Sequence, residues 1–233
     1  MEDDRMFWRK TSVTAFEFEK VKNSSWLRRI LRFGGALVLS QLPVLWFLKV
    51  PQESSGRLSW AIGMVLTSII TIYILTRWYL KVRPKNDTFA LPEPEMLLEI
   101  FVFFILMWIV SAIVTRFMPA GSSPNVDKIS QSLAQIKVPT VLYAGLFAPI
   151  IEELTYRGIF TSCVGDKLKT YQLIIFSGFV FGILHGFPLV YFLSKFLFGM
   201  VACYLYRRGH SLASDMLFHL LNNSLIFLVL VAQ

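Results

Sequence analysis

The sequence predicts an all-α protein, a polytopic bundle of about seven membrane-spanning helices. Of its 233 residues, 55% are hydrophobic and only 16% are charged, and the mean hydropathy is +0.57. Soluble domains carry more charge and less apolar surface than this. The apolar residues form long windows without strict alternation. Because a backbone in lipid must satisfy its own hydrogen bonds, these windows favour helices over the strands of a β-barrel.

Seven windows are each long enough to cross about 30 Å of hydrocarbon as a helix. In chain order they are residues 30–48, 58–80, 97–117, 138–164, 171–187, 189–206 and 212–231. A charged, proline-containing linker at 83–95 separates the first two from the rest. A polar loop at 119–139 follows the third window, and its spacing of apolar residues predicts a short amphipathic helix over 125–136.

The chain divides by composition into three parts. Residues 1–29 form a basic segment that is expected to lie on the cytoplasmic side, residues 30–137 hold the front helices and loops, and residues 138–233 form a C-terminal helical core. With the N-terminus in the cytoplasm, sixteen Lys and Arg residues fall on the cytoplasmic side and five on the opposite side. Positive charge in short loops is retained on the cytoplasmic side, so this multi-pass orientation is predicted.

The net charge of +8 raises the question of nucleic-acid binding. The basic residues, however, lie at the ends of the apolar windows and in short loops rather than on one module, so no nucleic-acid partner is expected. Anionic lipid headgroups are the expected counter-charge. The two cysteines, Cys163 and Cys203, lie in or beside windows that end in the cytoplasm, which argues against a structural disulfide.

Polar side chains interrupt the apolar windows of the C-terminal core, where they are costly and are usually retained for function. Glu153 and Arg157 are four residues apart, the spacing of an intrahelical ion pair. Neighbouring side chains on a helix point about 100° apart, so Glu152 is predicted not to share a partner with Glu153. Glu152 then lacks a local cation and can act as a general base. A purely structural Glu153–Arg157 clamp explains that pair equally well, but it does not explain Glu152.

Two further windows bring histidines. Glu152 and His185 are separated by 33 residues, with a charged turn midway, so an antiparallel hairpin brings them to similar depth, where they can share one water. His219 and Asn223 lie on one face of the last helix, and donors so arranged suit an oxyanion. Phe181 is expected to pack against the His185 ring. Each histidine could instead be a helix-packing residue.

Three motifs in this region match a family pattern. EELTYR, residues 152–157, fits EExxxR; FGILH, residues 181–185, fits FxxxH; and HLLNN, residues 219–223, fits HxxxN. The chain resembles the CPBP family of intramembrane proteases, also called the CAAX protease and bacteriocin-processing or Abi family, over residues 138–233. The resemblance implies a metal-independent glutamate peptidase without a cofactor, acting on membrane-associated peptides or lipidated proteins in a bacterial plasma membrane.

The resemblance also implies a role for each matching residue. Glu152 would be the general base and His185 its companion in activating water, while His219 and Asn223 would stabilise the oxyanion. Glu153 and Arg157 would organise the helix, with Phe181 beside His185.

Three alternatives remain open from the sequence. Two histidines and a glutamate can form a catalytic zinc site, although no HExxH motif occurs. The protein could also be a non-catalytic membrane scaffold or immunity protein. A proton-coupled carrier is the third alternative, but the inverted repeats typical of carriers are not recognisable.

Overall fold

The computed structural model describes residues 17–18, 21, 23–48, 50–51, 54–117, 136–187 and 189–232. Every regular element among these residues is helical, which confirms the predicted all-α fold. Most of the N-terminal segment and almost all of the predicted helix over 125–136 lie outside the described residues.

In the described part of the chain, the helices match the predicted windows in number and order. They are α3 (Trp26–Gln41) with the 3-10 turn η1 (Pro43–Leu48), α4 (Ser54–Val82), α5 (Pro94–Phe117), a fourth span made of several segments, α9 (Thr170–His185), α10 (Leu189–Gly209) and α11 (Leu212–Ala232). The segments of the fourth span are η2 (Tyr143–Phe147), α7 (Ala148–Glu153), η3 (Leu154–Phe160), α8 (Thr161–Val164) and η4 (Gly165–Lys167).

Length and apolar composition support a multi-pass membrane protein. Within the described residues, five helical spans are long and apolar enough to cross a membrane: Trp26–Phe47, Ser54–Val82, Pro94–Val114, Ile136–Lys167 and Leu189–Gly209. The α9 helix is a shorter apolar helix of 16 residues, and α11 has 21 residues. The side of the membrane on which each end lies stays a prediction.

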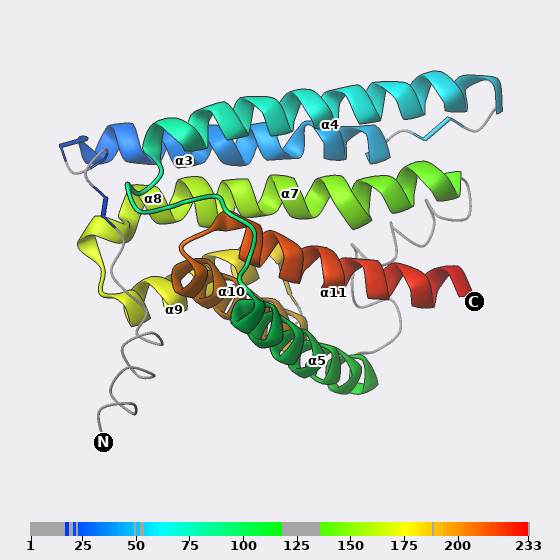
Figure 1. Ribbon diagram of the computed structural model, residues 1–233. Coiled ribbons are helices and arrows are strands. Elements are labelled where there is room, and N and C mark those ends of the chain that lie inside the picture. The colour runs from blue at the N-terminus through cyan, green and yellow to red at the C-terminus, as the bar shows by residue number, and fades with distance from the viewer. Residues whose placement is uncertain are drawn as a thin grey trace.

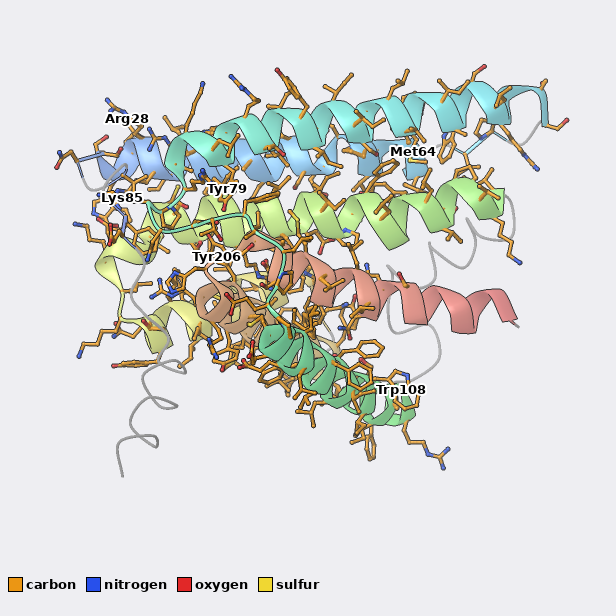
Figure 2. All side chains as sticks on the ribbon, in the orientation of Figure 1. Arg28, Met64, Tyr79, Lys85, Trp108 and Tyr206 are labelled. Carbon is orange, nitrogen blue, oxygen red and sulfur yellow. The ribbon has the colours of Figure 1, made fainter. Side chains whose placement is uncertain are left out.

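The fourth span lies in the middle of the bundle (Figure 1). Helices α3 and α4 run side by side over one face of it, and α11 lies along the other, with α5, α9 and α10 beyond. All seven residues of η3 are buried. Figure 2 shows Met64 and Tyr79 on the side of α4 that faces the fourth span, and both side chains are fully buried. The fourth span is therefore shielded on several sides, as a helix that carries charged residues through a membrane must be.

The outward faces of the helices are apolar instead. On α5, for example, Leu98, Phe101 and Trp108 are each at least half exposed, and Figure 2 shows Trp108 at the outer part of this helix. Apolar surface this extensive is normally covered by a partner or by lipid. Lipid contact therefore accounts for the surface of α5, as expected of a membrane bundle.

Polar contacts tie the connecting segments to one end of the bundle. In the linker after α4, the buried carboxylate of Asp87 accepts hydrogen bonds from the hydroxyls of Tyr79 and Tyr206, the latter at 2.7 Å. The guanidinium of Arg29 pairs with Asp166 and donates to the carbonyl of Cys163 at 2.9 Å. These contacts join α3, α4, α8 and α10 and hold the fourth span in register with its neighbours.

Candidate active site

The helix of the fourth span is widened on both sides of its two glutamates. Both η2 and η3 are π-helical, and the short α-helical segment α7 between them ends at Glu153. Pro149 lies in the first turn of α7 and has no N–H to donate, so the regular hydrogen-bond pattern cannot pass through it. The helix around Pro149 therefore forms a pair of widened turns rather than a break. Such π-helical turns redirect side chains and frequently occur at functional sites.

Glu152 faces histidines from two other helices. Its Oε2 atom lies 3.6 Å from His185 Nε2 and 3.8 Å from His219 Nε2. The side chain of Glu152 is 28% exposed, which leaves solvent a route to it. Both separations exceed a direct hydrogen bond, and polar groups at such distances can contact one water molecule together. The structure therefore brings together three residues that the sequence singled out.

The orientation of His185 follows from its own helix. Its Nδ1 atom lies 2.7 Å from the carbonyl oxygen of Phe181. A carbonyl can only accept, so Nδ1 carries a hydrogen and Nε2 is the nitrogen presented to Glu152. The rings of Phe181 and His185 have their centroids 4.1 Å apart, which confirms the predicted packing of these two side chains.

His219 bridges the two glutamates, contrary to the prediction that Glu152 and Glu153 have no common partner. Its Nδ1 lies 2.5 Å from Glu153 Oε1, while Nε2 faces Glu152. The prediction was wrong because it assumed that a partner side chain has a single polar atom. An imidazole has nitrogens on two sides of its ring, so one ring fits between side chains that diverge by about 100°.

The predicted ion pair of Glu153 and Arg157 is confirmed. The two side chains are fully buried, with Arg157 Nη1 3.1 Å from Glu153 Oε1. The guanidinium also donates to the carbonyl of Gly199 on α10 at 3.2 Å and lies 4.5 Å from the Phe181 ring centroid. The pair thus connects three helices. This agrees with an organising role for the pair.

Close approach of α9 and α10 makes this arrangement possible. A Cβ atom built on Gly199 would lie 2.9 Å from the Cα of Gly178 and 2.9 Å from the Cβ of Phe181. The backbones therefore touch at this level, as small residues allow between membrane helices. The contact seats Phe181 among the rings of Tyr156, Phe198 and His219.

Asn223 shares a face of α11 with His219, as predicted, but its contact is structural. The amide Nδ2 donates to the carbonyl of Ala144 in η2 at 2.9 Å. This bond fixes α11 against the first widened turn. An amide nitrogen carries two hydrogens. One is used in this bond, and the other can be donated to a substrate.

Four further groups at the site were not identified from the sequence. Asp215 on α11 is fully buried and interacts electrostatically with Glu153. The buried phenols of Tyr143 and Tyr156 and the ammonium of Lys195 interact electrostatically with Glu152. The sequence did contain one signal for Asp215, because it lies four residues before His219 and so on the same helix face.

Metal ligation has little geometric support in this region. Among the described residues, no group of three or more His, Cys, Asp and Glu side chains is arranged to hold a metal ion. The alternative of a zinc centre therefore gains no support from the described part of the chain.

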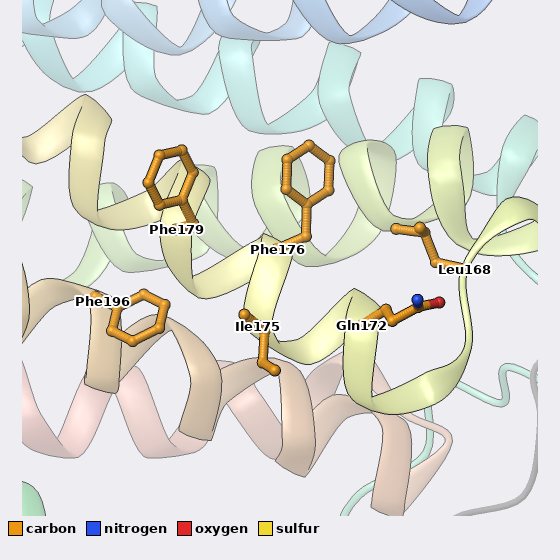
Figure 3. Close-up of a pocket in the computed structure, with 6 residues that line it drawn as sticks. All are labelled: Leu168, Gln172, Ile175, Phe176, Phe179 and Phe196. Atoms are coloured by element: carbon orange, nitrogen blue, oxygen red, sulfur yellow. The ribbon is translucent and has the colours of Figure 1, made fainter.

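A separate apolar groove lies on the surface of α9 and α10 (Figure 3). It is lined by Leu168, Gln172, Ile175, Phe176, Phe179 and Phe196. Neither Glu152 nor either histidine of the site contributes to it. The groove is therefore distinct from the polar cluster.

Comparison with known proteins points to one family. Residues 134–225 match the family model described as Type II CAAX prenyl endopeptidase Rce1-like, and this range contains all three motifs. A curated protein of Lactococcus lactis subsp. lactis (strain IL1403), "UPF0177 protein YaiF", is 30% identical over 151 residues, which cover 58% of this chain and 64% of that relative. The match thus spans less than two thirds of the relative's length. No solved structure matches the chain.

Proposed function

We propose, from the match of residues 134–225 to the family model of Rce1-like type II CAAX prenyl endopeptidases, that the protein is an intramembrane endopeptidase. Its substrates would be membrane-associated peptides or lipidated proteins, and glutamate-activated water would hydrolyse their peptide bonds. The observation that carries the proposal is the convergence of His185 and His219 on the partly exposed carboxylate of Glu152.

The first step is the activation of water. A water molecule between Glu152 and His185 gives a proton to the Glu152 carboxylate while its oxygen attacks the carbonyl carbon of the scissile bond. His185 orients this water through Nε2, because its Nδ1 is engaged with the carbonyl of Phe181. The geometry supports these roles, since the carboxylate and the free ring nitrogen face each other at 3.6 Å.

The second step is the stabilisation and collapse of the tetrahedral intermediate. The carbonyl oxygen becomes an oxyanion, which requires donors held in place before the reaction. Protonated His219 presents Nε2–H toward the Glu152 side of the site, and the second hydrogen of the Asn223 amide is the other donor. When the C–N bond breaks, Glu152 returns its proton to the leaving amine.

The remaining residues hold the reacting groups in place. Glu153 fixes the His219 ring through Nδ1, and Arg157 neutralises Glu153 while binding α10. Phe181 contacts the His185 ring and the Arg157 guanidinium. Their burial keeps bulk water away from the reacting groups, which strengthens each electrostatic contact.

The test compares membranes of cells that produce the wild-type chain or Glu152→Gln. Peptide mass spectrometry should find at least one membrane-associated peptide whose cleavage falls by about a hundredfold or more in the variant. Glu93→Gln, which alters an exposed carboxylate of the linker, is the matched control and should cleave normally. Equal cleavage by Glu152→Gln and wild type would remove the proposed base. If membranes with the wild-type chain contain no cleavage product, the result would favour a non-catalytic scaffold.

A further inference from the structure

A third carboxyl group lies beside the two glutamates. Asp215, in the first turn of α11, is fully buried. Among the described residues, neither of its carboxyl oxygens has a hydrogen-bond donor, and the same is true of Oε2 of Glu153. Unsatisfied buried carboxylate oxygens are costly, so three in one place require an explanation.

The three oxygens belong to side chains that contact each other. The carboxyl groups of Asp215 and Glu153 are close enough to form a hydrogen bond if one of them carries a proton. An ionised carboxylate can only accept, so two ionised groups cannot form this bond. One proton held between them supplies the missing donor and gives both side chains a partner.

The charges around the pair lead to the same conclusion. Arg157 is the cation that faces Glu153, from the same helix, and His219 contacts Glu153 from α11. With Asp215 and Glu153 both ionised, two buried negative charges would lie side by side. Two carboxyl groups this close in a low-dielectric interior do not both ionise. A shared proton leaves the pair with one negative charge, opposite Arg157 and His219.

We propose that Asp215 is a positioning residue, which holds a proton and donates it in a hydrogen bond to Oε2 of Glu153. This bond turns the other oxygen, Oε1, toward Arg157 and His219 Nδ1. His219 is thereby held with Nε2 facing Glu152. The chain of contacts runs from Asp215 through Glu153 and His219 to Glu152. The effect on cleavage depends on the proposed function, whereas the shared proton does not.

Infrared spectroscopy of the purified full-length protein tests the proton directly. The wild type at neutral pH should show the carbonyl band of a protonated carboxylic acid, shifted by exchange into deuterium oxide. Asp215→Asn should lack this band, because its amide donates to ionised Glu153 permanently. The control Glu93→Gln should retain it. The proposal is overturned when the wild type lacks the band or Asp215→Asn keeps it.

Cleavage measurements test the positioning role. Asp215→Asn retains a donor and should cleave within about threefold of wild type. Asp215→Leu, which is similar in size but cannot donate, should lose about tenfold or more, the range found for groups that orient a reacting residue. Thermal unfolding of both variants is measured in parallel. Equal losses of cleavage in folded Asp215→Asn and folded Asp215→Leu would contradict the positioning role. A loss of cleavage in Asp215→Asn with its fold intact would also contradict it. Absence of cleavage by the wild type would instead refute the proposed function and leave the infrared result standing.

Discussion

His219 contacts Glu153 through Nδ1 at 2.5 Å and turns its other nitrogen toward Glu152. One imidazole therefore separates two adjacent carboxylates that have different surroundings. Glu153 is fully buried and paired with Arg157, whereas Glu152 is partly exposed and faces histidines. Two neighbouring residues of the same type can perform different tasks when their environments differ in this way.

The two glutamates should respond differently to the same substitution. Glu153→Gln leaves the buried guanidinium of Arg157 without its carboxylate, so the free energy of unfolding should fall by about 3–5 kcal/mol. Glu152→Gln removes a partly exposed charge and should change the free energy of unfolding by less than about 1 kcal/mol, although cleavage is lost. Denaturation of both variants in the same detergent gives the comparison. Equal destabilisation by the two would mean that Glu152 is also a structural residue.

The sequence predicted what depends on local patterns. The seven helices that match these windows in the described residues follow from apolar composition, because hydropathy depends only on nearby residues. The Glu153–Arg157 pair follows from a spacing of four on one helix. The motif spacing also placed His185 at the depth of Glu152, since a hairpin fixes relative depth.

Features that depend on how helices are seated against each other could not be predicted. The bridging position of His219 requires the exact rotation of α11 against the fourth span. The bond from Asn223 to the carbonyl of Ala144 depends on the widened turn η2, which no sequence pattern indicated. Asp215 resembled an ordinary acidic residue in the first helical turn, where carboxylates are favourable at the surface. Its burial was invisible without the tertiary structure.

The contact between α9 and α10 should tolerate no added methyl group. In Gly199→Ala, the new Cβ would meet the Gly178 backbone and the Phe181 Cβ at 2.9 Å, so the helices must separate. We expect a loss of about 1–3 kcal/mol in the free energy of unfolding. Gly34→Ala is the matched control, because a Cβ there meets nothing within 4 Å and alanine favours a helix. A stable Gly199→Ala would show that the two backbones are not in contact.

The hydrogen bonds of the linker should contribute measurably to stability. Tyr206→Phe removes the hydroxyl that donates to Asp87 at 2.7 Å and leaves Tyr79 as the remaining phenol on that carboxylate. The buried carboxylate loses one of its donors, which should cost about 1–3 kcal/mol. Tyr73→Phe, on the exposed side of α4, is the control and should be neutral. Thermal unfolding measures the stability of the two variants. Unchanged stability in Tyr206→Phe would show that Asp87 is held by its other contacts alone.

Cleavage should not depend on a divalent metal ion. In the proposed reaction, water is activated by Glu152 and His185, and charge is stabilised by His219 and Asn223, so every step uses protein groups. Full activity is therefore expected after dialysis against a strong chelator, measured on the peptide identified by mass spectrometry.

A zinc-dependent mechanism predicts the opposite result: activity falls on chelation and returns when zinc alone is added. That result would reassign His185, His219 and Glu152 as metal ligands. Inhibition by added zinc without prior chelation would not reassign these residues as metal ligands. A metal that binds to histidines can also block the site.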